Sequence, residues 1–271
     1  MLDLEKMTFL TREQLRTQAP TVFALKPSDE VSKKYTHIPT LKVVEDMEKL
    51  GWKVVDAKQV KARAKSTKGF QKHLVTFRNP DVVINGDDGD TVFPQILLTN
   101  SHDGKNAFTF TAGLFRMVCE NGLVVADKEF GALKMRHMGY TFEQLQVKIL
   151  EMVESLPLTV ETLNKMKQIE LDKKQKKALA KKALTTRFSK DQIKSFKIDL
   201  DKMIEPIRNE DSGNDLWSVF NRVQENIVEG NFKYYNAKTL GSERQARPIK
   251  NFKQDMDVNK KLFSAALEYA A

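Results

Sequence analysis

The sequence predicts an α+β protein with an N-terminal helix-and-sheet core and a mainly helical C-terminal half. Between residues 53 and 118, short apolar runs alternate with turn-forming residues, a pattern that is typical of strands. After residue 139, apolar residues recur at helical spacing instead. The chain has 271 residues, 41% of them hydrophobic, which is enough for one large core or for two domains.

These patterns divide the chain into three parts. Residues 1–27 are expected to be a flexible N-terminal segment, because Pro20 and Pro27 interrupt any long helix. Residues 28–139 are expected to form the α+β core. Residues 140–271 are expected to form the helical region, so the main boundary falls near residue 140.

The first ordered element is expected to be a helix that ends at Leu50. Apolar residues recur at three-residue steps from Ile38 to Leu50, and Gly51 ends the run. Trp52 then opens the first strand. The strands are expected at residues 53–57, 73–78, 93–98 and 107–118, with an exposed turn at residues 85–90.

The helical region begins with an apolar stripe over residues 142–153, which Pro157 interrupts. One later helix has clear boundaries, because Asn214 or Asp215 can cap its start and Gly230 can end it. Further helices are expected at residues 158–187, 196–204 and 216–227, and from about residue 257 onwards.

The positive charge of the chain is concentrated in one segment. The whole chain carries a net charge of +9, and residues 157–187 contain nine basic residues against three acidic ones. The basic residues are Lys165, Lys167, Lys173, Lys174, Lys176, Lys177, Lys181, Lys182 and Arg187. Such a localised positive field attracts phosphates without giving sequence specificity.

The lysine-rich helix, residues 158–187, is the strongest sign of a partner. Residues 172–177 include no apolar residue, so this part should protrude into solvent or lie against an acidic partner. A solvated helix surface is the alternative. The residues expected to bind nucleic acid are Lys72, Arg78, Lys105, Arg116, Lys173, Lys174, Lys176, Lys177, Lys181, Lys182, Arg244 and Arg247. Phe70 and Tyr234 are candidates for base stacking.

A polar turn between two strands supplies the only catalytic candidates, His102 and Asp103. His102 could act as a base, but no nucleophile elbow or paired zinc-binding histidines accompany it. The alternative is a tight turn in which Asp103 accepts backbone hydrogen bonds and Gly104 supplies a positive φ. The tight turn is the preferred interpretation.

Several residues are expected to have structural roles. Cys119 follows an apolar strand and is expected to be a small core residue, although a single cysteine could also be a nucleophile. In the helix at residues 216–227, a polar row beside Trp217 should hold another element by hydrogen bonds. The structural candidates are Trp52, Gly104, Cys119, Asn121, Trp217, Asn221, Gln224 and Glu225.

The composition also excludes some classes of protein. One cysteine rules out an internal disulfide. With only four histidines, a zinc site would need an unusual ligand set rich in carboxylates. No metal or other cofactor is therefore predicted. No stretch of about 18 apolar residues is present, so we expect no membrane span and a location in the cytoplasm.

Four segments together resemble a known family. They are residues 101–104, 116–121, 216–225 and 247–262. These segments are similar to the phage/plasmid-like protein family 932, a domain of unknown function, over roughly residues 20 to 271. The resemblance implies an origin in a mobile element such as a bacteriophage, a prophage or a conjugative plasmid. It implies no reaction.

A second resemblance concerns the N-terminal half. Residues 35–39 lead into a helix that closes with Leu50, Gly51 and Trp52, and strands follow. This order is similar to the opening of single-strand annealing proteins. It implies a helix packed on a mostly antiparallel, curved sheet.

The leading hypothesis is a non-catalytic nucleic-acid-binding protein of a phage or plasmid, acting in DNA recombination, single-strand annealing or DNA protection. Single-stranded DNA is the favoured partner, and a homo-oligomer is expected. A protein-interaction module that inhibits a host defence system, binding a host or phage protein, is the alternative. An enzyme centred on His102 and Asp103 is the third interpretation.

Overall fold

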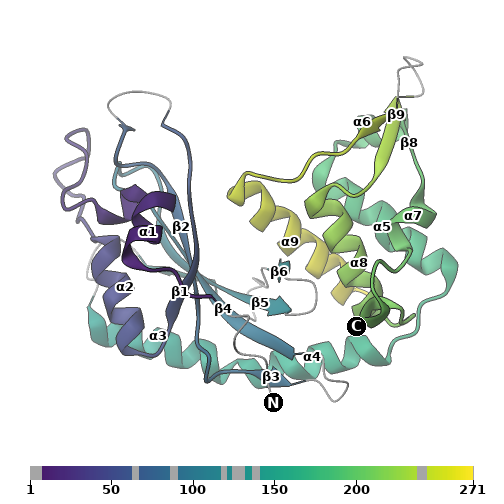
Figure 1. Cartoon of the computed structure of the whole chain (residues 1–271), viewed down its shortest axis with the longest axis horizontal. Helices are drawn as coiled ribbons and strands as arrows, with labels where there is room; N and C mark the ends of the chain where they lie inside the picture. The colour runs from purple at the N-terminus through teal and green to yellow at the C-terminus, as the bar shows by residue number, and fades with distance from the viewer. Residues whose placement is uncertain are drawn as a thin grey trace. The chain divides into compact units, whose positions relative to one another are not determined.

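The computed structural model describes residues 8–62, 67–85, 91–116, 121–123, 132–135, 141–236 and 243–270. The chain forms two compact units, Met1–Leu156 and Pro157–Ala271 (Figure 1). The predicted boundary near residue 140 is wrong. Leu145, Ile149 and Met152 lie in the core of the first unit, so the helix that carries them belongs there.

The first unit is built on an antiparallel sheet with the strand order β1-β2-β4-β5-β6, in which β3 also pairs with β4 and β7 with β5. The described strands are β1 (Lys53–Gln59), β2 (His73–Arg78), β3 (Ile84–Asn85), β4 (Thr91–Asn100), β5 (Phe108–Arg116), β6 (Asn121–Leu123) and β7 (Ala132–Met135). The chain therefore has the predicted α+β fold, with a curved sheet (Figure 1).

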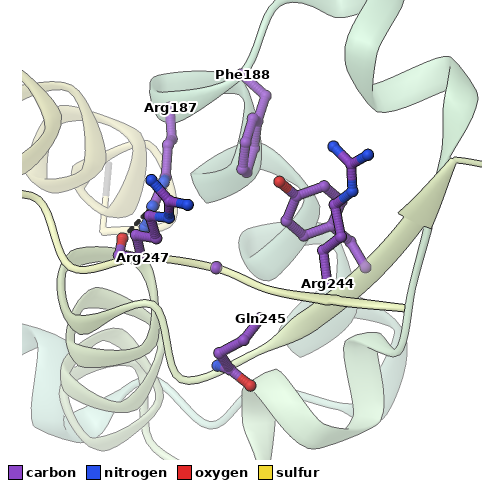
Figure 2. A pocket seen from close by; sticks show the side chains of 7 residues that line it. Arg187, Phe188, Arg244, Gln245 and Arg247 are labelled. Atoms are coloured by element: carbon purple, nitrogen blue, oxygen red, sulfur yellow. Dashed lines mark hydrogen bonds between the residues drawn. The ribbon is translucent and has the colours of Figure 1, made fainter. Parts of the chain in front are cut away.

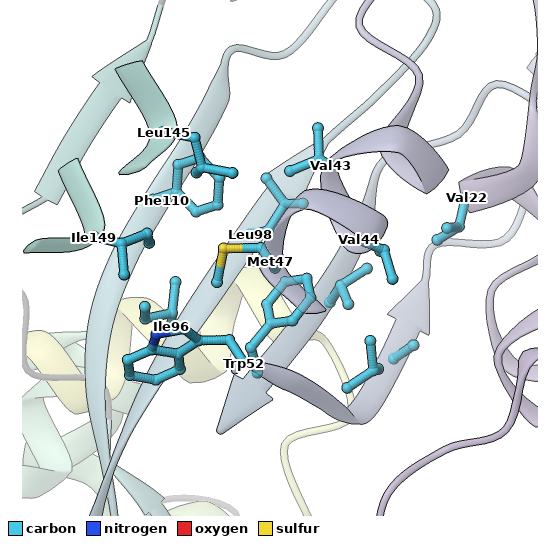
Figure 3. Close-up of a cluster of buried hydrophobic side chains, with 14 of the residues drawn as sticks. Val22, Val43, Val44, Met47, Trp52, Ile96, Leu98, Phe110, Leu145 and Ile149 are labelled. Atoms are coloured by element: carbon cyan, nitrogen blue, oxygen red, sulfur yellow. The ribbon is translucent and has the colours of Figure 1, made fainter. Parts of the chain in front are cut away.

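Helices cover one face of this sheet, and their apolar side chains form a single core with it. The helices are α1 (Arg12–Gln18), the 3₁₀ helix η2 (Pro20–Phe23), α2 (Thr40–Lys49) and α3 (Phe142–Glu154). Ile96 and Leu98 alternate along β4, and Leu98 lies opposite Phe110 of β5. Met47 of α2 and Trp52 complete the same cluster (Figure 3).

The prediction that residues 1–27 are flexible is wrong for the part that the structure describes. Residues 12–23 form α1 and η2, and Leu15, Ala19 and Val22 are buried in the core. Thr11 starts α1 with a capping box. Pro20 stands at the first position of η2, so it begins a short helix and does not disrupt the packing.

The second unit consists of helices around a buried central helix, α8 (Leu216–Glu229), together with a three-stranded antiparallel sheet in the order β10-β9-β8. Twelve consecutive residues of α8, 216–227, are buried. The other elements are α4 (Leu156–Gln168), α5 (Lys173–Arg187), α6 (Lys190–Ser195), β8 (Phe196–Ile198), α7 (Leu200–Ile204), η4 (Asn209–Asp211), β9 (Lys233–Asn236), β10 (Arg244–Gln245) and α9 (Phe252–Leu267). The C-terminal part, predicted to be mainly helical, thus also contains a small sheet.

The predicted lysine-rich helix at residues 158–187 is two helices, α4 and α5. The chain between them forms an isolated bridge, in which Glu170 pairs with Asp215. Leu171 N–H donates to the Asn214 carbonyl at 3.0 Å. Asp172 then begins α5 with a capping box. The sequence pattern predicts one continuous helix over residues 158–187. The bridge between Glu170 and Asp215 interrupts that helix, and the Asp172 cap starts the next one.

The burial of α1 leads to a stability prediction. Replacing Leu15, which is 1% exposed, by alanine should lower the free energy of unfolding of the first unit by about 2–5 kcal/mol, because a buried cavity is left behind. Leu25 is 79% exposed, so Leu25→Ala should change the free energy of unfolding by less than about 0.5 kcal/mol. Urea unfolding followed by circular dichroism measures both. Equal effects of the two substitutions would contradict the placement of α1 in the core.

Candidate functional site

The helix α5 does not protrude into solvent as a free basic arm. Leu179, Ala180, Ala183 and Leu184 on one of its faces are buried, and α5 contacts α7, α8 and α9. The lysine-free face is therefore part of the core of the second unit. The lysines lie on the remaining face, which is the arrangement expected for an ordinary amphipathic helix.

Most of the lysines of α5 meet polar groups of the same unit. Lys173 and Lys177 form ion pairs with Asp201 of α7 at 3.1 and 2.6 Å. The hydrogen bond from Lys177 has the largest effect in lowering the pKa of Asp201, and the one from Lys173 lowers it further. Lys176 donates to the Asn214 side chain at 2.5 Å. Lys182 pairs with Glu268.

These contacts reduce the positive field that a count of charges predicts for α5. Lys174 and Lys181 are both exposed. They belong to a solvated surface. The lysine run is thus a weaker sign of a nucleic-acid site than it is in the sequence alone.

A basic and aromatic pocket lies elsewhere in the second unit, with a volume of about 560 Å³ (Figure 2). We call it the arginine pocket. It is lined by Arg187, Phe188, Tyr234, Arg244, Gln245, Ala246 and Arg247. Residues from the C-terminal end of α5, from β9 and from β10 thus meet at one place. Among the described residues, the lining contains three arginines and no acidic residue.

The aromatic side of the pocket belongs to a cluster of four rings. Phe188 packs against Phe196, Phe232 and Tyr234, with ring centroids 5.5, 6.2 and 5.8 Å away. Phe196 and Tyr234 are 4.7 Å apart. This packing fixes the positions of Phe188 and Tyr234, the two members of the cluster that line the pocket.

Arg187 organises the pocket from within the protein. Its guanidinium donates to the Ile227 carbonyl at 2.5 Å and to the Arg247 carbonyl, so it joins α5 to the end of α8 and to the chain after β10. It also lies over the rings of Phe188 and Phe232, 5.5 and 5.7 Å from their centroids. Burial lowers the pKa of Arg187 from its ordinary value.

The backbone that carries Arg244 and Arg247 is anchored by the residues between them. The Gln245 amide donates to the carbonyls of Gly230 and Phe232 at 2.5 and 3.1 Å. The Ala246 N–H donates to the same Phe232 carbonyl at 2.9 Å. These hydrogen bonds hold the backbone between the two arginines, and both arginines are exposed at the pocket.

Gly230 makes this close approach feasible. It ends α8 with φ of +74°, a conformation that favours glycine. A Cβ atom at this position would lie 2.7 Å from the Ala246 carbonyl oxygen. The turn that closes α8 therefore also sets the position of the pocket wall.

Only two of the predicted nucleic-acid-binding residues, Arg244 and Arg247, lie in this pocket. Sequence reasoning placed Tyr234 nearby as a stacking candidate, but it missed the role of Arg187 and Phe188. The sequence does contain a sign of this role, because Arg187 and the aromatic Phe188 stand together at the end of the lysine-rich helix.

The remaining predicted contacts lie in the first unit. Arg78 is half-buried in β2, where burial lowers its pKa to about 10 although Asp56 opposes this shift. Lys72 is also half-buried. Lys105 is exposed and lies 4.0 Å from Glu30. Arg116 ends β5, and its side chain lies outside the described residues.

The catalytic candidate His102 is fully buried in a network that includes two further histidines. His102 Nδ1 lies 3.1 Å from His37 Nε2, and His102 Nε2 lies 3.4 Å from the Thr40 hydroxyl. The same hydroxyl lies 2.8 Å from His73 Nε2, while His73 Nδ1 lies 3.0 Å from the Gln71 carbonyl. Since that carbonyl can only accept, His73 is protonated at Nδ1 and its Nε2 accepts from Thr40.

The other candidate, Asp103, shapes a tight turn. It accepts hydrogen bonds from the Ser101 hydroxyl at 2.7 Å and from the Lys105 N–H at 3.0 Å, and Gly104 has φ of +70°. Burial, and then the Asp103 charge, raise the pKa of Tyr35 to about 12. The Tyr35 hydroxyl donates to the Ser101 carbonyl at 3.0 Å, so the turn ties two segments together.

Two of the predicted structural residues of α8, Gln224 and Glu225, bind neighbouring elements, whereas Asn221 forms a hydrogen bond within the helix. Gln224 donates to Asn259 of α9 at 2.9 Å, and Glu225 accepts two hydrogen bonds from Arg208 at 2.7 and 2.6 Å. Asn221 donates to the carbonyl of the buried Trp217 at 2.8 Å. Trp52 is likewise buried, whereas Cys119 and the side chain of Asn121 lie outside the described residues.

The described ranges contain neither a metal-binding cluster nor a membrane-spanning helix. Within these ranges, no group of three or more His, Cys, Asp or Glu side chains is arranged to hold a metal ion. In the same part of the chain, no helix has the length and apolar character needed to cross a membrane.

The histidine network leads to a pH prediction. Burial lowers the pKa of His73 from 6.5 to about 4, so the unfolded chain binds a proton more readily than the folded one. The free energy of unfolding should therefore fall by roughly 3 kcal/mol as the pH drops from 6.5 to 4. Urea unfolding at a series of pH values measures this loss.

His73→Gln provides the control for this prediction, because glutamine keeps an acceptor for Thr40 and does not titrate. His37 and His102 are present in both proteins, so the difference between the two profiles reports the substitution at position 73. The variant should be less stable at pH 7 and should lose less stability below pH 6.5. Parallel profiles of the two proteins would contradict a neutral, buried His73.

Comparisons with known proteins give the family of the chain. Residues 27–263 match the family described as "Domain of unknown function (DUF932)". The chain is 32% identical over 257 residues to UPF0380 protein YafZ and 31% identical over 257 residues to UPF0380 protein YfjQ, both of Escherichia coli (strain K12). Each alignment covers 95% of this chain and 90% of the relative, and no solved structure matches. The chain therefore belongs to the family of the domain of unknown function DUF932.

Proposed function

We propose that this protein binds nucleic acid without catalysis, with single-stranded DNA as its preferred ligand, through the arginine pocket. The observation that carries the proposal is that three arginines lie with Phe188 and Tyr234 in a pocket whose described lining residues include no acid. Arginines bind phosphate through charge-assisted hydrogen bonds. Aromatic rings stack on unpaired bases of any sequence.

The aromatic residues favour a single strand over a duplex. In a duplex the faces of the bases are covered by their neighbours, and only the phosphates and groove edges are accessible. In a single strand the base faces are available to Phe188 and Tyr234. The net charge of +9 supports the same class of ligand, because it attracts polyanions over a long range.

The wider biological role is part of the proposal. A mobile-element protein that binds single strands would act in DNA recombination, strand annealing or DNA protection, and as a homo-oligomer it would bind several stretches of one strand. Its place of action would be the bacterial cytoplasm.

A second candidate function is binding of an acidic host or phage protein. It is favoured by the exposed Lys174 and Lys181 on α5, which lie outside the pocket. This function would need the α5 surface and would not need the aromatic residues. The two candidates therefore differ in which substitutions abolish binding.

The binding test uses fluorescence anisotropy with labelled single-stranded DNA, duplex DNA and RNA across a salt series. The single strand should bind most tightly, and log Kd should depend linearly on log salt concentration. Arg244→Ala combined with Arg247→Ala should reduce the slope of this dependence by about 1.4, since each phosphate contact on a single strand contributes about 0.7.

Lys33→Ala combined with Lys34→Ala is the matched control, because it removes two exposed positive charges from the first unit. It should leave the salt slope unchanged. Lys174→Ala combined with Lys181→Ala compares the α5 surface with the pocket. Failure to bind any probe at low salt would refute the proposed function, and loss of binding only in the α5 variant would transfer the site to that helix.

A pair of neighbouring tyrosines tests the stacking contribution. Tyr234 lines the pocket, whereas Tyr235 is 38% exposed and lies beneath Lys197. Tyr234→Ala should weaken single-strand binding by about 1–3 kcal/mol, and Tyr234→Phe should retain it. Tyr235→Ala should have little effect. Equal losses at the two positions, in proteins with unchanged circular dichroism, would argue against stacking in the pocket.

A further inference from the structure

The cationic groups of the arginine pocket are divided between two sides of Phe188, one of its two aromatic residues. Figure 2 shows Arg187 and Arg247 on one side of Phe188 and Arg244 on the other. A ligand whose ring lies against Phe188 would therefore have positive charge available on both sides. This distribution differs from a single cluster, which would suit one isolated anion.

The two outer arginines differ from Arg187 in their availability. Arg187 uses its donors on the carbonyls of Ile227 and Arg247 and stabilises the fold. Arg244 and Arg247 are exposed, and neither makes an ion pair with an acid within the described part of the chain. Their guanidinium groups can each present two parallel donors to a phosphate.

The size of the pocket limits the ligand further. Its volume of about 560 Å³ is in the range of sites for small molecules and cofactors. It suits one nucleotide and is too small for a base pair with its backbone. The aromatic side, formed by Phe188 and Tyr234, matches one base face.

We propose, on the basis of the proposed function, that the pocket holds one unpaired nucleotide together with the phosphates on both sides of it. The base lies against Phe188 and Tyr234, one phosphate binds Arg244, and the other binds Arg247. The smallest complete ligand is then a nucleoside 3′,5′-bisphosphate. A nucleotide inside a strand carries both phosphates, so the pocket binds internal positions of a strand and needs no free end.

Competition experiments with the full chain test this inference. The probes are adenosine 3′,5′-bisphosphate, adenosine 5′-monophosphate, adenosine and inorganic pyrophosphate, each measured for direct binding by calorimetry and as a competitor of a labelled single strand. The bisphosphate should bind about tenfold or more tightly than the monophosphate, a difference of about 1.4 kcal/mol. Pyrophosphate, which has charge but no base, should bind more weakly than the bisphosphate.

Single substitutions assign the two phosphates. Arg244→Ala and Arg247→Ala should each reduce bisphosphate affinity to about that of the monophosphate for the unaltered protein. Arg244→Lys and Arg247→Lys keep the charge and should lose only part of the affinity. The Arg247 contact to Arg187 uses the backbone carbonyl, so the alanine variant retains it, and circular dichroism checks the fold.

The outcomes separate this inference from the proposed function. Binding of the single strand with equal affinities for bisphosphate, monophosphate and pyrophosphate would overturn the two-phosphate site and leave nucleic-acid binding in place. Tight bisphosphate binding without any binding of single strands would support the site and overturn the proposed function. Bisphosphate binding that is unchanged in both alanine variants would also overturn the inference.

Discussion

The second unit depends on the burial of residues 216–227 of α8, a stretch that carries polar side chains with almost no access to water. Each buried polar group needs a partner, because an unpaired one would cost about 1–3 kcal/mol. Gln224 donates a hydrogen bond to Asn259, and Glu225 accepts one from Arg208. Asn226 donates to the Met203 carbonyl at 3.0 Å. These bonds fix the neighbouring elements around α8, and they specify the arrangement more tightly than apolar contacts alone.

The arginine pocket is a consequence of how α8 ends. Gly230 closes the helix in a left-handed conformation, and the chain then enters β9. Arg187 binds the Ile227 carbonyl near this end and the Arg247 carbonyl beyond β10. The pocket is therefore held by backbone acceptors on two segments, while the side chains of Arg244 and Arg247 take no part in holding it. Separating the supporting groups from the exposed ones is what preorganises a binding site.

Local sequence patterns predicted much of the fold. The start of α8 was predicted at Asn214 or Asp215 and its end at Gly230, and the helix is capped by Asp215 and Gly230, because caps depend on a few adjacent residues. The α+β class followed from the change of periodicity near residue 139. Three predictions were wrong for a common reason. Burial of α1, the break between α4 and α5, and the assignment of α3 to the first unit all depend on contacts with residues distant in the sequence.

The candidate site, like the fold, was predicted in part from the sequence and in part could be seen only in the tertiary structure. The sequence alone determined that positive charge is concentrated near α5, that no metal or cofactor signature accompanies it, and that Arg244 and Arg247 are candidates. Only the tertiary structure decided which charges are paired, because Asp201 and Glu268 reach the α5 lysines from other helices. It also brought Arg187 and Phe188 to the two candidate arginines. Charge and periodicity are properties of a segment, whereas ion pairing and a shared pocket require elements that meet only after folding.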